Sequence, residues 1–203
     1  MTGHTTLRDL LTEKEYSRVK HYFEEKSTML PFSVLETYKP MLASSLLSEG
    51  QLPCEGAISM EQVIMMAAKE KGKKIKGLET MAQQAGFLDS IPYKYQAAEL
   101  VKYIDSSGTD QQENKLMTQL FDAYRNQDLK KLEELMMDGD AGMSSFSDIL
   151  LYRRNANWVI KLKTLMAEKS LLIAVGAGHL PGDRGVINLL RKAGYTVTPV
   201  ENK

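Results

Sequence analysis

The sequence predicts an α/β fold: a small, mainly parallel sheet with a C-terminal βαβ unit and a large helical insertion. Residues 171–175 are a short unbroken apolar run, which is typical of a strand buried on both faces. Residues 195–200 alternate and are rich in β-branched residues, which predicts a second strand. Between them lie a glycine-rich turn and a helical pattern that stops at Gly194. A strand, helix and strand within thirty residues predict parallel strands with a right-handed crossover.

The rest of the chain is mainly helical in pattern. Thr12 opens a capping box before a helical stripe, and Ser59 begins another helix. Residues 73–79 predict a short strand that lies in one sheet with residues 171–175. Apolar residues recur at helical spacing from Pro92 onwards. We therefore expect a single α/β domain over residues 1–203, with the helical insertion spanning about residues 85–168.

Composition narrows the function classes. The 203 residues are 43% apolar and 26% charged, with zero net charge, which is ordinary for a soluble globular protein. Balanced charge gives no electrostatic case for nucleic acid or an anionic membrane as a partner. No apolar run is long enough for a membrane span, and no signal-peptide core is present in this chain. The single cysteine, Cys54, excludes an internal disulfide framework and a cysteine-based zinc site. Oligomeric state and compartment are not predicted.

The glycine-rich turn at residues 176–182 carries His179 and has three interpretations. Its glycines approach a dinucleotide-binding fingerprint, although the third glycine comes one residue late. Alternatively, the imidazole of His179 lies at the end of a strand, where flanking glycines let a substrate or metal approach the backbone. The third interpretation is a tight turn with a solvated histidine.

The last long helix, predicted at residues 147–168, places polar side chains on its apolar face. Asn155 falls in the middle of the apolar stripe, and Arg154 lies at its edge. An amide or guanidinium that faces the interior costs several kcal/mol unless it is paired. Both residues should therefore meet acceptors, in either a structural or a functional role.

Glu79 raises the same question at the end of the predicted strand at residues 73–79. Its carboxylate can bind a metal, act as a general base, or accompany a helix cap at Thr80. His4 and His21 have no acidic or histidine partner at ligand spacing, so surface positions are expected. The interior polar set is Glu79, Arg154, Asn155 and His179.

Several segments together resemble the TraB/GumN family, which is related to the Tiki proteases and more distantly to the ChaN and erythromycin-esterase proteins. The C-terminal signature is the clearest. Its matching segments are Gly176-Ala177-Gly178-His179-Leu180-Pro181-Gly182, Gly185-Val186, Leu189-Leu190 and Gly194-Tyr195-Thr196-Val197. Further matches are Thr6–Leu11, Gly77-Leu78-Glu79-Thr80, Gln83, Ala123-Tyr124, and Arg153-Arg154-Asn155 with Trp158.

This resemblance implies a metal-dependent hydrolase that acts on peptides or small molecules, with manganese or cobalt as candidate ions. It implies that His179 is a metal ligand and that Glu79 is a ligand or general base. Arg154 and Asn155 would then orient the carboxylate or stabilise a developing oxyanion. Family members are expected to carry two Gly-x-x-His motifs, of which residues 176–179 resemble the second. The first has no counterpart here, so the resemblance implies a chain that lacks its first βα portion. The alternative within the family is a non-catalytic peptide- or signal-binding protein.

Overall fold

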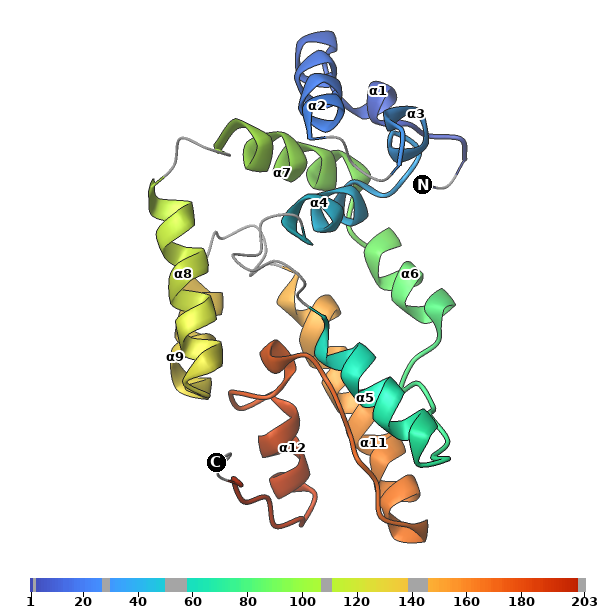
Figure 1. The fold of residues 1–203 in the computed structure, drawn as a ribbon, viewed down its shortest axis with the longest axis vertical. Coiled ribbons are helices and arrows are strands. Elements are labelled where there is room, and N and C mark those ends of the chain that lie inside the picture. Colours follow the sequence, from blue (N-terminus) through green and yellow to red (C-terminus); the bar gives the residue numbers. More distant parts are fainter. Residues whose placement is uncertain (2, 27–29, 50–57, 107–110, 139–145, 201–203) are drawn as a thin grey trace. The chain divides into compact units, whose positions relative to one another are not determined.

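The structure is a computed structural model that describes residues 1, 3–26, 30–49, 58–106, 111–138 and 146–200. These residues form helices joined by turns and coil, and no strand occurs among them (Figure 1). The chain divides into two compact units, Met1–Asp110 and Gln111–Lys203. Within the described ranges, no helix is long and apolar enough to cross a membrane.

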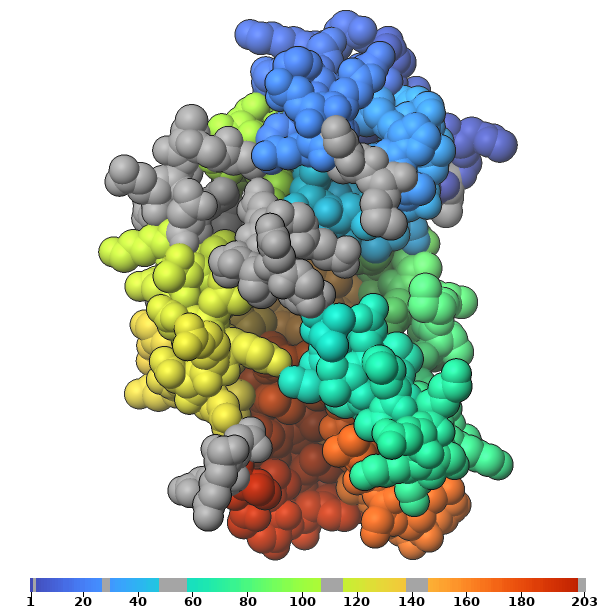
Figure 2. All heavy atoms as spheres, viewed as in Figure 1, coloured from blue at the N-terminus to red at the C-terminus, as the bar shows by residue number. Residues whose placement is uncertain are grey.

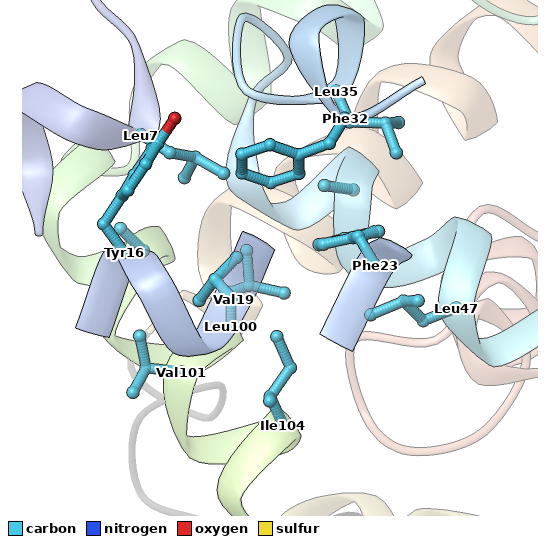
Figure 3. Close-up of a cluster of buried hydrophobic side chains, with 12 residues drawn as sticks. Leu7, Tyr16, Val19, Phe23, Phe32, Leu35, Leu47, Leu100, Val101 and Ile104 are labelled. Carbon is cyan, nitrogen blue, oxygen red and sulfur yellow. The ribbon is translucent and has the colours of Figure 1, made fainter. Parts of the chain in front are cut away.

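The first unit consists of helices around one apolar core. Its helices are α1 (Leu7–Leu10), α2 (Glu13–Glu25), α3 (Phe32–Leu35), α4 (Pro40–Glu49), α5 (Met60–Glu70), α6 (Met81–Asp89) and α7 (Tyr93–Ser106). The core takes side chains from α1, α2, α3, α4 and α7, as Figure 3 shows. Tyr16, Val19 and Phe23 recur at helical spacing on α2 and are all buried in this core. The ring of Phe32 packs against Tyr16 and Phe23, at centroid distances of 5.6 and 5.9 Å.

Side-chain caps fix the starts of three helices in this unit. Thr12 caps α2 through the predicted capping box, in which the Thr12 N–H donates to the Glu15 carboxylate at 2.9 Å. Ser59 caps α5, as predicted, and Thr80 caps α6. Neither α5 nor α6 contains a buried residue, so both helices lie outside the core.

The second unit carries the C-terminal signature. It contains α8 (Gln111–Arg125), α9 (Leu129–Asp138), a π-helical turn η1 (Asp148–Tyr152), α11 (Arg153–Glu168), a 3₁₀ turn η2 (Ala177–His179) and α12 (Val186–Lys192). Leucines of α9 and Ala123 of α8 form a small core against which Ala177 of η2 packs. Helix α12 packs on α11, which also contributes the buried side chains of Trp158, Val159 and Leu162.

The predicted α/β fold with a parallel sheet is wrong. Residues 73–79, 171–175 and 195–200 are coil or bends, and Ile75 and Leu172 are 58% and 82% exposed. An apolar run becomes a strand only where a neighbouring strand bonds its N–H and C=O groups. No strand within the described part of the chain offers that pairing. The βαβ pattern therefore keeps its turn and helix, η2 and α12, without its strands.

The positions of two predicted helices are confirmed. The helix expected from Pro92 is α7, and the helix expected at residues 147–168 is η1 followed directly by α11. Gly194 ends α12 with a φ of +91°, the left-handed conformation that favours glycine. The prediction of one domain with an insertion at about residues 85–168 stays a prediction.

Candidate functional site

The turn that carries His179 extends over residues 176–185 and packs against α9. The His179 N–H donates to the Gly176 carbonyl at 2.9 Å, which closes the 3₁₀ turn η2. A side chain at Gly178 would put its Cβ 2.8 Å from the Met136 methyl group of α9, so glycine lets the helix approach. Gly182 has a φ of +81°, and the carboxylate of Glu133 lies where its Cβ would be. The turn therefore lies directly against one face of α9, and His179 is 8% exposed.

Asn155 of α11 binds this turn through three polar contacts. Its side chain is 1% exposed, which confirms the predicted inward orientation. The Asn155 Nδ2 donates to the carbonyl of Arg184 at 2.9 Å and to that of His179 at 3.4 Å. The Asn155 Oδ1 lies 2.6 Å from Nδ1 of the His179 ring. One amide thus holds both the backbone of the turn and its imidazole.

These contacts determine the tautomer of His179. Because two carbonyl oxygens face the nitrogen of the Asn155 amide, its oxygen must be the atom that faces the ring. An amide oxygen only accepts, so Nδ1 of His179 donates to it. The neutral ring then carries its lone pair on Nε2. A histidine in this tautomer can bind a metal or accept a proton through Nε2.

An aromatic and a cationic side chain complete the surroundings of the imidazole. The Trp158 ring lies 4.4 Å from the His179 ring, centroid to centroid, at 43° between planes. The Arg154 guanidinium lies over the Trp158 ring at 5.0 Å and donates to the Leu150 carbonyl at 2.7 Å. Trp158 is buried, and within the described residues its indole N–H has no acceptor. Residues 155 and 158 share one face of α11, so the same helix supplies both contacts to the ring.

A charged clamp, formed by Asp148, Arg153 and Arg184, ties the turn to the start of α11. The Asp148 carboxylate accepts hydrogen bonds from Arg184 and Arg153, each at 2.5 Å. The guanidiniums of Arg184 and Arg153 hold the pKa of the Asp148 carboxyl below its ordinary value. The Arg184 side chain also lies over the Tyr152 ring at 4.3 Å. Since the carbonyl of the same Arg184 accepts from Asn155, the clamp helps to place the acceptor that orients the amide.

The clamp was not predicted from the sequence. Asp148 and Arg184 are 36 residues apart, and no local spacing pairs them. The N-cap of α12 is Gly185, which has no side-chain hydrogen bond. The available signal was an arginine beside the His179 turn, together with an aspartate near the start of the helix that carries Asn155.

Glu79 belongs to the first unit, whereas Arg154, Asn155 and His179 belong to the second. Glu79 is half-buried in a bend. The cap of α6 comes from its neighbour Thr80, whose hydroxyl accepts from the Gln83 N–H at 3.2 Å. A shared site of Glu79 and His179 stays a prediction.

A metal site would need further ligands. No group of three or more histidine, cysteine, aspartate or glutamate side chains that could hold an ion is found among the described residues. A catalytic metal typically keeps three protein ligands. His179 fits the role of one ligand, because its tautomer leaves the lone pair on Nε2. The described residues therefore do not form a complete metal site.

Comparison with known proteins identifies the family. The model of the TraB/PrgY/gumN family matches residues 1–199. The chain belongs to this family. That match extends across both units and includes the His179 turn and α11.

Two curated proteins are similar to this TraB/PrgY/gumN member at low identity. A metalloprotease TIKI homolog from Amphimedon queenslandica is 32% identical over 74 residues, which cover 33% of this chain and 14% of that protein. Metalloprotease TIKI2 from Danio rerio is 28% identical over 115 residues, which cover 55% of this chain and 18% of that protein. The chain thus spans less than a fifth of the length of each relative. No solved structure matches it significantly.

Proposed function

We propose that this chain belongs to a metal-dependent hydrolase of peptidase type and contributes His179 as a metal ligand. The observation that carries the proposal is the Asn155–His179 pair, which directs the lone pair of the neutral ring to Nε2. Membership of the TraB/PrgY/gumN family and the similarity to proteins named metalloproteases support the same reaction class. Manganese and cobalt are the candidate ions. A divalent ion supplies Lewis-acid polarisation of a carbonyl and activation of water.

In this proposal the protein side chains have separate roles. Asn155 holds the His179 ring in one tautomer. The substrate in this proposal is a peptide or a small molecule. Arg154, held by the Leu150 carbonyl and the Trp158 ring, stabilises negative charge that develops on the substrate. Glu79 is the candidate second ligand or general base.

A second candidate function is non-catalytic peptide binding. The observation in its favour is that the described residues hold no three-ligand metal group. A binder needs neither the metal nor the lone pair of His179. Its peptide affinity would therefore be indifferent to a chelator and to loss of the imidazole.

Peptide cleavage separates the two functions. This chain, and any longer gene product that contains it, would be assayed with a peptide library in the presence of manganese, cobalt or a chelator. We expect metal-dependent cleavage that is lost in His179→Ala, and little or no cleavage wherever the ligand set is incomplete. His21→Ala is the matched control, because the His21 side chain is 73% exposed. Activity should also fall at acidic pH, since a protonated imidazole has no lone pair for a metal.

Three outcomes would go against the hydrolase. Cleavage that persists in the chelator would reject the metal mechanism. Equal losses in His179→Ala and His21→Ala would show that the imidazole of His179 has no special role. Peptide binding without turnover in every gene product, and with the same affinity after His179→Ala, would establish the binder instead.

A further inference from the structure

The segment of residues 58–76, which comprises α5 and the loop after it, exposes apolar side chains and contributes none to the apolar core of the first unit. No residue of α5 is buried. Met60, Met66 and Ile75 are 58%, 68% and 58% exposed, and Ile58 is 65% exposed. Figure 2 shows this segment, in turquoise, at the surface of the face drawn. A group of neighbouring exposed apolar side chains of this kind marks an interaction surface.

Four apolar residues of α5 share one face of the helix. Met60, Val63, Ile64 and Ala67 follow the i, i+3, i+4, i+7 spacing that places side chains on a common stripe. At about 100° per residue, Lys71 comes back to the same stripe three turns after Met60. The apolar face therefore runs directly into the basic loop.

The loop concentrates positive charge. Lys69, Lys71, Lys73, Lys74 and Lys76 lie within eight residues of sequence, and all five are exposed. Among the ion pairs between described residues, none involves these lysines. The segment holds two glutamates against the five lysines, so it is strongly basic within a chain of zero net charge. Because charges beyond about 8 Å are screened at physiological salt, acidic residues elsewhere do not cancel this local field.

We propose that residues 58–76 bind an anionic lipid surface. In this arrangement the stripe of α5 lies at the boundary between headgroups and acyl chains, and the lysines contact the headgroups. The pairing of an apolar face with a basic cluster is what such binding requires, because either alone holds a protein weakly. Nucleic acid fits less well, because the segment contains no aromatic side chain on which a base could stack.

Vesicle binding by the full chain tests the proposal. Flotation would be measured with phosphatidylcholine vesicles, with and without phosphatidylglycerol, at low and high salt. We expect binding only to the anionic vesicles, weakened by salt. Each lysine near an anionic surface is worth about fivefold in affinity, so changing Lys71, Lys73 and Lys74 to Gln should weaken binding by about a hundredfold. Met60→Ser with Val63→Ser should weaken binding to the same vesicles with all lysines intact.

The control removes the same charge elsewhere. Lys14, Lys115 and Lys163 are exposed and lie in other segments of the chain. Changing these three to Gln should reduce binding far less than the triple change in the loop. Equal losses in the two triple variants, equal binding to neutral and anionic vesicles, or no binding would each overturn the proposal. Binding that polyglutamate abolishes while the two serine changes on α5 leave it intact would also overturn it, because an acidic protein would then be the partner.

Discussion

Replacement of Asn155 by alanine tests the central contact of the candidate site. Asn155 is 1% exposed and makes polar contacts with the Arg184 carbonyl, the His179 carbonyl and the His179 ring. Asn155→Ala leaves these buried groups without the amide, which should lower the free energy of unfolding by roughly 1–3 kcal/mol. Chemical denaturation would be followed by fluorescence, since Trp158 is the sole tryptophan of the chain and lies one turn away on α11. The signal therefore reports on the unit that contains the change.

The same helix offers a matched control. Asn157 is exposed and lies two residues from Asn155 on α11. Asn157→Ala makes the same chemical change and the same gain in helix propensity, at most about 0.7 kcal/mol, without touching the turn. The quantity of interest is the difference between the two variants. A difference below about 0.5 kcal/mol, the usual range for exposed sites, would refute the buried contact.

Two further predictions concern the clamp and the glycines of the turn. The pKa of Asp148 is lowered by Arg184 and Arg153, so the stability from these bonds should be present above the unfolded-state pKa and lost as pH falls through the folded pKa. A carboxyl titration by NMR should show this pKa rise in Arg184→Gln, and an unchanged titration would mean that the bond is not formed in solution. Gly185→Ala should cost about 1–3 kcal/mol, because its Cβ would fall on backbone carbonyl oxygens of the turn. Gly176→Ala should stay within about 0.5 kcal/mol, because its nearest neighbour, the His179 ring, would be 3.8 Å away; equal losses at the two glycines in denaturation would contradict this packing.

Local sequence signals predicted the helices because the backbone hydrogen bonds of a helix join residues of the same short segment. Thr12 and Ser59 begin helices through their own side chains, and Gly194 ends one through its own φ angle. The buried Asn155 was found in the same way, from its place on an apolar stripe. Each of these signals needs only residues within a few positions of one another.

The prediction of strands was wrong, and the clamp was not predicted, for a common reason. A strand at residues 171–175 depends on a partner strand far away in sequence, and no apolar run can specify that partner. The bond between Asp148 and Arg184 likewise joins residues that are 36 positions apart. The irregular start of α11, the π-helical turn η1, places Asp148 near Arg184, and helical periodicity does not predict such a turn.

Helices hold the candidate site in place where the sequence pattern predicts strands. In a βαβ unit, the end of a strand fixes the glycine-rich turn. Here Met136 and Glu133 of α9 lie against Gly178 and Gly182, and Asn155 of α11 binds the turn through its amide. The orientation of the His179 ring therefore depends on the packing of helices, although the sequence pattern places it after a strand. Because the Asn155 amide takes its own orientation from carbonyls of the turn, the backbone of the turn and the tautomer of its histidine are fixed by the same three contacts.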